Sequence, residues 1–421
     1  MSSLIISKDE VNTGRQREID LLKAYSIIMM IITHCIDELF DYEGHIVSVV
    51  IDDILAQSVG AQGFMICMGI GVVYAGRGRD SKALSKGQIK RGISLLVTGQ
   101  LLNLIRYALP YFIAYIKTGD ALFRTSMFLV FSSDILQFAG LFFILIGLLY
   151  RLKFRSAHVF MLSIIMTIAG MLTCGRIATE SYAFDQLLGL FIFTNTESYF
   201  PLFHWMIFPA FGMVYGDVLL HVNDKKKFYG RLLILTTIVF VIYYYFGLRG
   251  DQNVFTVFKT WQSFSYMSIY DAFMQLFCNT AVICICFFIT EPLSKSAMRP
   301  IEFVSKNINR YYCVHSVLIY YAATMLEVLS DGKFESAALC YIAALVIMLL
   351  TTLVVIIYGQ YFAKPIGEII TSHRGLFYTL VIIASVLACV YAGKGVEWDY
   401  GSFPNMMNDY ISATISSDFL S

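Results

Sequence analysis

Long apolar runs recur along this chain, and short polar segments separate them. Most runs approach the roughly 20 residues that a helix needs to cross the apolar core of a bilayer. The amphipathic run 46–57 suits a re-entrant or interfacial helix instead. The pattern predicts an all-α, multi-pass membrane bundle with about eleven transmembrane helices, at residues 19–40, 58–76, 91–116, 130–150, 156–175, 201–221, 230–248, 270–290, 308–329, 337–362 and 376–393.

No internal repeat and no Pro- or Ser-rich linker divides these runs, so they predict one membrane domain, residues 17–393. A polar, cytoplasmic N-terminus (1–16) precedes this domain, and an external tail (394–421) follows it. Composition agrees, because 57% of the residues are hydrophobic and only 14% are charged, against roughly 25% charged residues in soluble domains. The chain is therefore expected in the cell membrane, with lipid around it.

The orientation follows from the charges of the polar segments. The connection after the second predicted span is basic, from Arg77 to Arg91, whereas the connection after the first is acidic. Later connections keep this alternation, and positively charged loops stay in the cytoplasm. An odd number of spans then predicts a cytoplasmic N-terminus and an external C-terminus.

Several classes of function find no support in the composition. A net charge of +1 gives no electrostatic reason to bind nucleic acid. The nine cysteines are scattered, mostly through apolar runs, and form neither a disulfide framework nor a metal-ligand pattern. The sequence also lacks a Walker-type phosphate loop, an HExxH motif and a nucleophile elbow. No metal and no bound cofactor is expected.

Polar side chains within the predicted spans are the functional candidates, because charge is costly in lipid. Lys23 and His34 of the first span are eleven positions apart. This spacing is almost three whole helical turns, so the two residues share a face and lie about 16 Å apart along the axis. Asp20 is on the same stripe and is expected to pair with Lys23. Later spans add Asn103, Arg106, Asp134, Gln137, His204, Trp205, Asp271, Gln275 and His315.

Each candidate also has a structural explanation. Lys23 can extend to the membrane interface, and His34 can hydrogen-bond a neighbouring carbonyl. Arg106 and Asp134 can form a buried ion pair or bind an acceptor. Trp205 suits either an aromatic belt or stacking on a sugar ring.

The first span resembles that of acyltransferase family 3 and of the related heparan-alpha-glucosaminide N-acetyltransferase-like proteins. Their shared motif is Arg or Lys, ten residues and His, and this chain has Lys23, ten residues and His34. Arg17, Ile19 and Asp20 match the residues upstream. Weaker matches follow in the family's order, at 63–77, 132–149, 200–217 and 307–321.

The resemblance implies a membrane acyltransferase. Such enzymes move an acyl group, here expected to be acetyl, from cytoplasmic acyl-CoA to a hydroxyl or amine of an extracytoplasmic acceptor, usually a glycan of the cell envelope. Direct transfer is preferred over a covalent acyl-enzyme. His34 would be the general base, and Lys23 would bind the CoA side or polarise the acyl group. The supporting or substrate-binding candidates are Arg17, Asp20, Arg106, Asp134, His204, Trp205 and His315. The candidates for binding the CoA phosphates are Arg77, Arg79, Lys90 and Arg91, although the positive-inside rule also explains this basic segment.

Two alternatives stay open. Intramembrane charges suit a transporter or flippase equally well, although no inverted repeat is visible. A scaffold could also keep the fold without the chemistry. Loss of His34 separates these readings, because only a catalyst requires it for acyl transfer. The sequence leaves open the acceptor, O- versus N-transfer, acyl length, oligomeric state and whether a covalent acyl-enzyme forms.

Overall fold

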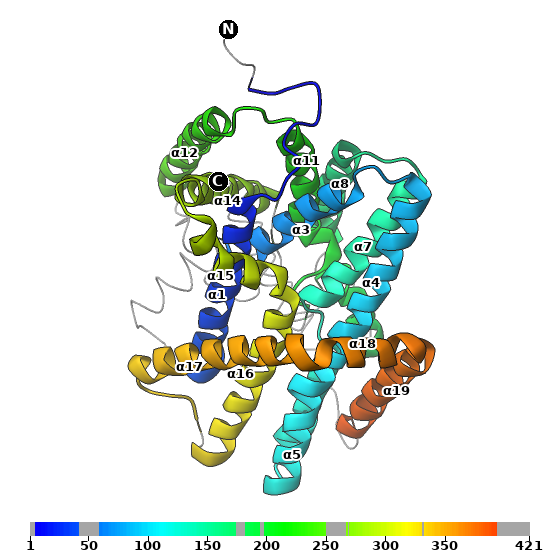
Figure 1. Ribbon diagram of the computed structural model, residues 1–421. Helices are drawn as coiled ribbons and strands as arrows, with labels where there is room; N and C mark the ends of the chain where they lie inside the picture. Colours follow the sequence, from blue (N-terminus) through cyan, green and yellow to red (C-terminus); the bar gives the residue numbers. More distant parts are fainter. Residues whose placement is uncertain are drawn as a thin grey trace. The chain divides into compact units, whose positions relative to one another are not determined.

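The computed structural model describes residues 5–41, 59–173, 182–193, 198–249, 267, 269–330 and 332–393. These residues form helices, joined by short connections and a few isolated β-bridges (Figure 1). The predicted all-α class is therefore confirmed for the described residues. The amphipathic run 46–57 and the tail 394–421 lie outside them.

Every predicted span coincides with a helix. Within the described residues, eight helical stretches are long and apolar enough to cross a membrane. They are Arg17–Leu39 (α1), Ser81–Thr118, Ser156–Thr173 (α8), Leu202–Leu220, Asp271–Thr290, Ile308–Ser330 (α16), Ala337–Ser372 and Arg374–Ala392 (α19). Two shorter apolar helices, Gly60–Gly76 (α3) and Ile135–Arg151 (α7), and the helix Lys225–Arg249 (α12) occupy the other predicted positions. The chain is thus a multi-pass membrane protein, while the total of eleven spans and the orientation stay predictions.

The helices form two compact units, which are described separately. The first unit comprises Met1–Arg79, Phe208–Lys259 and Tyr270–Thr379. The second comprises Asp80–Ile207, Thr260–Ile269 and Leu380–Ser421.

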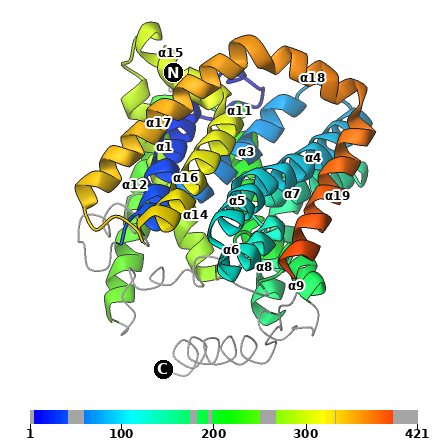
Figure 2. The same ribbon diagram turned by 90° about the horizontal axis from the view of Figure 1, so that it is seen from below.

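Helix α1 is the centre of the first unit. It contacts α3, α15 (Lys295–Lys306), α16 and α17 (Ala337–Ile357), and Figure 2 shows it beside α16 and α17. Buried side chains on several sides of α1 explain why this helix is apolar around most of its circumference. The apolar cluster at its C-terminal end comprises Ile31, Cys35, Ile36, Leu39, Phe40, Ile319, Cys340, Ala344 and Ile347.

Glycines bring α3 and α11 (Ile207–Leu220) into backbone contact in the first unit. A Cβ on Gly69 would lie 1.9 Å from the carbonyl oxygen of Pro209, and one on Gly212 would lie 2.1 Å from that of Ile66. No side chain fits either position. Small residues allow the same close approach between helices in many membrane proteins.

The polar N-terminal segment packs on the C-terminal end of α11. The Ser7 N–H donates to the carbonyl of His221 at 2.8 Å, and the Val11 N–H donates to that of Leu220 at 3.0 Å. Arg77 at the end of α3 forms a 2.7 Å salt bridge with Glu10. These contacts order the described part of the segment before α1 begins.

In the second unit, one long helical run is built from α4 (Ser81–Asn103), a π-helical turn η2 (Leu104–Ala108) and α5 (Leu109–Thr118) (Figure 1). It begins earlier than predicted, because Asp80 caps α4 by accepting the N–H of Ala83 at 2.7 Å. The basic residues Lys82, Lys86, Lys90 and Arg91 are therefore helical, and the prediction of a loop reaching Arg91 is wrong.

Helix α4 packs along α7, with Gly92 and Gly140 at the contact. The rest of the second unit includes α6 (Ala121–Ser126), the short helix η3 (Met127–Phe131), α9 (Tyr182–Gly189) and α10 (Leu202–Trp205). Helix α10 packs on α8. A second apolar cluster comprises Ala108, Met127, Phe128, Val130 and Ala392.

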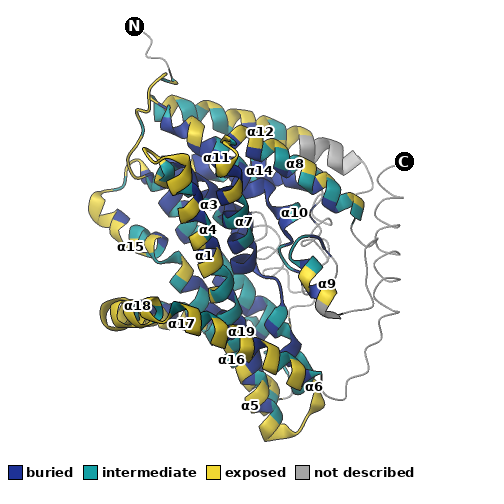
Figure 3. Ribbon diagram, turned by 90° about the vertical axis from the view of Figure 1, so that its right-hand side faces the viewer, coloured by how far each residue is buried: buried dark blue, intermediate teal, exposed yellow. Residues whose placement is uncertain are grey.

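Exposed apolar side chains cover the helices near the C-terminus. Helix α17 continues through the π-helical turn η4 (Tyr358–Phe362) into α18 (Ala363–Ser372), and Figure 3 shows much of this run exposed. Leu345, Leu349 and Leu353 are each at least half exposed. Such a surface is expected where lipid is the solvent.

Candidate active site

Two candidate histidines from different predicted spans lie side by side in the first unit. His34 of α1 and His315 of α16 have ring centroids 5.6 Å apart, with their planes at 56°. His315 is fully buried, and its Nδ1 lies 2.7 Å from the carbonyl oxygen of Tyr311. A carbonyl only accepts hydrogen bonds, so this contact assigns the proton to Nδ1 and the lone pair of the neutral ring to Nε2. His34 is half-buried beside it.

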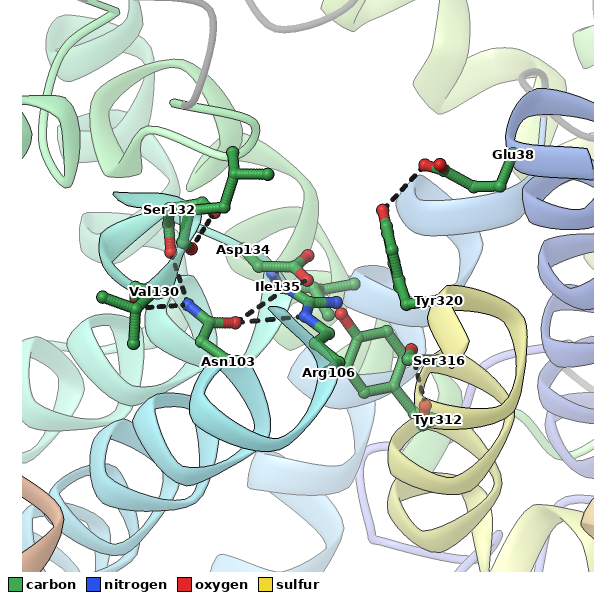
Figure 4. Close-up of polar contacts among 11 residues, drawn as sticks. Glu38, Asn103, Arg106, Val130, Ser132, Asp134, Ile135, Tyr312, Ser316 and Tyr320 are labelled. Atoms are coloured by element: carbon green, nitrogen blue, oxygen red, sulfur yellow. Dashed lines mark hydrogen bonds and ion pairs between the residues drawn. The ribbon is translucent and has the colours of Figure 1, made fainter. Parts of the chain in front are cut away.

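Further polar contacts join the same helices near this pair. The hydroxyl of Tyr320 donates to Glu38 at 2.8 Å (Figure 4). The ring of Tyr312 packs edge-on against His315 at 5.6 Å. Lys333, after α16, donates to the carbonyl of Asp37. Together with the apolar cluster at the end of α1, these contacts fix α1 against α16 at the level of the two histidines.

Lys23 occupies a different environment from the one predicted. It is half-buried, and within the described residues it has no hydrogen-bond or ion-pair partner. The predicted Asp20–Lys23 pair is wrong, because Asp20 accepts two hydrogen bonds from Arg15, at 2.5 and 2.8 Å, and one from Ser305 at 2.6 Å. Helical spacing considers only neighbours within α1, whereas Arg15 precedes the helix and Ser305 belongs to α15. Arg17 donates to the carbonyl of Leu293 and so anchors the start of α1.

One buried acid of the first helix was missed by the sequence analysis. Glu18 is 1% exposed, forms a 2.7 Å salt bridge with Lys225 and accepts the hydroxyl of Tyr229 at 2.7 Å. The Tyr229 ring stacks on Phe287 at 4.5 Å. Glu18 resembled an ordinary acid in the first turn of a helix, which the helix dipole alone explains. Nothing local in the sequence points to its partners on α12.

In the second unit, Arg106 and Asp134 form an ion pair, which is one of the two roles that the sequence left open for them (Figure 4). Arg106 is 2% exposed and projects from the π-helical turn η2. It also donates to the Oδ1 of Asn103 at 2.8 Å, while the Nδ2 of Asn103 donates to the carbonyls of Val130 and Ser132. Asp134 caps α7 by accepting the N–H of Ile135 at 2.6 Å. The ion pair therefore joins η2 to the start of α7.

His204 and Trp205 are both fully buried. The Nδ1 of His204 lies 3.3 Å from the carbonyl oxygen of Met267, and the Trp205 ring packs edge-on against Phe200 at 4.8 Å. No face of the indole is exposed for an aromatic belt or a sugar ring. These positions favour the packing interpretation of both residues.

The four phosphate-binding candidates are divided between the units. Arg77 is engaged with Glu10, and the guanidinium of Arg91 lies 4.1 Å from the centroid of Phe143. Arg79 and Lys90 are exposed. Among the described residues, no group of three or more His, Cys, Asp or Glu side chains is placed to hold a metal ion.

The fold and these side chains define a class: a multi-pass membrane protein with titratable residues inside its helices. The family model described as heparan-alpha-glucosaminide N-acetyltransferase, catalytic, matches residues 15–246, more than half of the 421 residues. The chain belongs to this family, whose description indicates an acetyltransferase that acts on a glycan. The matched region contains Lys23, His34, Arg106 and Asp134, whereas His315 lies beyond it. No curated protein and no solved structure matches the chain.

Proposed function

We propose that this protein transfers an acetyl group from cytoplasmic acetyl-CoA to a hydroxyl or amine of a cell-envelope glycan. The observation that carries the proposal is the pairing of His34 with His315 in a family of acetyltransferases. Imidazole is the side chain best suited to exchange protons near neutral pH. The wider likeness of the first helix to acyltransferase family 3 supports acyl-CoA as the donor.

His34 acts as the general base in this scheme. Its imidazole takes the proton from the acceptor oxygen or nitrogen while that atom attacks the thioester carbonyl carbon. The carbon–sulfur bond then breaks, and the proton leaves with the CoA thiol. Transfer is direct, so no acyl group is attached to the protein.

His315 is the positioning residue for His34. With its proton held on Nδ1 by Tyr311, its Nε2 can accept an N–H from the neighbouring imidazole. That contact would select the tautomer of His34 and stabilise the imidazolium formed during transfer.

Lys23 has a separate role in donor binding. It lies about 16 Å from His34 along the helix axis, too far for both side chains to reach the same carbonyl. An ammonium that pairs with none of the described residues suits the CoA portion of the donor, whose phosphates are anionic. The exposed Arg79 and Lys90 are further candidates for those phosphates.

The test is transfer of radiolabelled acetyl groups from acetyl-CoA to envelope glycan in membranes carrying the full chain. His34→Ala is expected to lower transfer by about 10²- to 10⁴-fold, the usual contribution of a general base. His373→Ala is the matched control, because His373 is an exposed histidine between α18 and α19, and it should transfer like the wild type. Equal labelling by the wild type and His34→Ala would refute the assignment of the base. If the wild type labels no acceptor from any acyl-CoA, the transporter hypothesis becomes the better explanation.

A further inference from the structure

Helix α15 is a polar helix that its two neighbours hold at the membrane surface. Residues 291–294 connect it to the span Asp271–Thr290, and Asn307 alone connects it to the span Ile308–Ser330. One span ends and the next begins on the same side of a bilayer, so α15 cannot move far from that surface. Its 12 residues extend about 18 Å, too short to cross the apolar core. It therefore lies at the interface between lipid and water.

The contacts of α15 fix which of its sides faces the protein. Ser305 is buried and donates to the Oδ1 of Asp20 in α1 at 2.6 Å. Met298, two turns before Ser305 on the same side, is 1% exposed. In the connection before α15, the carbonyl of Leu293 accepts from Arg17. The remaining sides of α15 are exposed and adjoin the membrane interface (Figure 3).

The exposed part of α15 carries three cations, Lys295, Arg299 and Lys306, which we call the α15 basic stripe. With 3.6 residues per turn, these three positions lie within about 40° of one another around the helix. Phe303, next to the stripe, is 36% exposed, and Pro300 beyond it is also exposed. An apolar surface beside a basic one is typical of a helix that lies in a membrane interface.

Two cations of the stripe have no counter-ion in the described part of the chain. The third, Lys306, lies 3.4 Å from Glu302, and the same carboxylate is 3.9 Å from Arg15. These two cations neutralise Glu302. Lys295 and Arg299 form no ion pair or hydrogen bond with any described residue. An anion from outside the chain would therefore meet an ammonium and a guanidinium that are both available.

We propose that Lys295 and Arg299 bind the phosphate of an anionic phospholipid in the adjoining leaflet, with Phe303 inserted among its acyl chains. A lipid is the occupant that the position of α15 favours, because both ends of the helix are tethered to spans. Arginine can bind a phosphate through two parallel hydrogen bonds, and lysine adds a point charge. The positive-inside rule explains cations in this connection, but not their position on one side beside an exposed ring. The inference is independent of acetyl transfer.

The experiment places a fluorescent reporter beside the α15 basic stripe. The full chain with Phe303→Trp is reconstituted in vesicles of phosphatidylcholine and phosphatidylglycerol. One lipid or the other carries bromine, which quenches tryptophan at short range, and the emission of the chain without the substitution is subtracted. Phosphatidylglycerol should quench about fivefold or more above its share of the bilayer, because each cation near the surface favours an anionic lipid by about that factor.

Phe112→Trp in α5 is the matched reporter. Phe112 is also 36% exposed, and it packs edge-on against a tyrosine as Phe303 does. The positions one turn before and after Phe112 hold Ala, Leu, Tyr and Ile, none of them a cation. This reporter should be quenched in proportion to the composition of the bilayer.

Paired substitutions then test the cations themselves. Lys295→Gln with Arg299→Gln should abolish the preference for phosphatidylglycerol at the Phe303→Trp reporter. Lys82→Gln with Lys86→Gln removes the same charge at the same spacing from exposed positions of α4 and should leave the preference unchanged. The exchange Lys295→Arg with Arg299→Lys should also keep it, because both charges remain.

Several outcomes would overturn the lipid site. These are quenching of the Phe303→Trp reporter in proportion to bilayer composition, or an equal loss of preference in the α4 variant. Displacement of phosphatidylglycerol by soluble acetyl-CoA or glycerol phosphate would assign the stripe to a free phosphate instead. If the reporter chain does not fold, native mass spectrometry of the chain without it gives the Kd for phosphatidylglycerol. Lys295→Gln with Arg299→Gln should raise that Kd about tenfold or more, and an unchanged Kd would refute the site.

Discussion

In both units of this protein, some polar side chains have several partners and others have none among the described residues. In the first unit, Asp20 and Glu18 are each held by several partners, whereas the half-buried Lys23 has no hydrogen-bond or ion-pair partner among the described residues. In the second unit, Arg106 and Asp134 hold each other, whereas Gln137 has no partner in the described residues. Groups that are satisfied join one helix to another. Groups without a partner among the described residues add no hydrogen bond between helices, although Gln137 still packs against Gly99 of α4.

Glycines bring helices into backbone contact in both units, but not at every position. In the first, α3 and α11 meet at Gly69 and Gly212, and in the second a Cβ on Gly92 would lie 2.5 Å from the carbonyl oxygen of Gly140. Gly99 of the second unit instead faces the end of the Gln137 side chain. Backbone cannot move away from an added methyl group, whereas the end of a side chain can adjust.

The largest loss of stability is expected when the Arg106–Asp134 ion pair of the second unit is broken. Arg106→Ala or Asp134→Ala leaves an unpaired buried charge and should destabilise the protein by about 3–5 kcal/mol. The double variant Arg106→Met with Asp134→Leu should recover most of this loss, because both charges are removed together. Thermal unfolding in detergent measures each change. Single variants that cost less than about 1 kcal/mol would show that the pair does not hold η2 to α7.

The next largest loss of stability is expected at Gly69, where a glycine faces the backbone of another helix. Gly69→Ala places a methyl group against backbone and should destabilise the protein by about 3 kcal/mol, the upper range for overpacking. Gly99→Ala meets a flexible amide and should cost less. Gly71→Ala serves as control, because nothing lies within 4 Å of its Cβ position, and it should be neutral or stabilising. Equal losses at Gly69 and Gly99 in chemical unfolding would remove the distinction between a glycine that faces backbone and one that faces a side chain.

A smaller loss is expected from the Glu18 network. Tyr229→Phe removes one hydrogen bond to a buried carboxylate and should destabilise the protein by about 1.5–2 kcal/mol. Tyr391→Phe, whose ring packs on Phe112 and whose phenol makes no hydrogen bond within the described residues, is the matched control. Scanning fluorimetry on both variants gives the comparison. A change no larger than that of the control would mean that Lys225 alone satisfies Glu18.

The smallest effect on stability belongs to Lys23. Since it has no partner in the described residues, Lys23→Met should change the unfolding free energy by no more than about 0.5 kcal/mol. It should raise the KM for acetyl-CoA about tenfold, as expected for the loss of a charged contact. Lys82→Met, at an exposed position of α4, should change neither quantity. Loss of stability without a change in KM would assign Lys23 to the fold.

The apolar periodicity of the sequence determined a large part of this protein. It placed helices at all the predicted spans, because twenty apolar residues in succession have few stable alternatives to a membrane helix. The motif of Lys23 and His34 led to a family likeness that the match over residues 15–246 confirms for the N-acetyltransferase branch. The ion pair of Arg106 with Asp134 was one of the two roles that the sequence left open, and the structure shows it, because two costly charges on neighbouring spans stabilise each other.

Only the tertiary structure decided which helix faces which. In the folded protein, His34 lies against His315, and Asp20 pairs with Arg15 rather than with Lys23. Glu18 is buried beside Lys225, and Trp205 is fully buried. Helical spacing shows which residues share one face of a helix, but it carries no information about the partner across that face. Lipid-facing and protein-facing residues are both apolar in a membrane protein, so hydrophobicity cannot supply that information either.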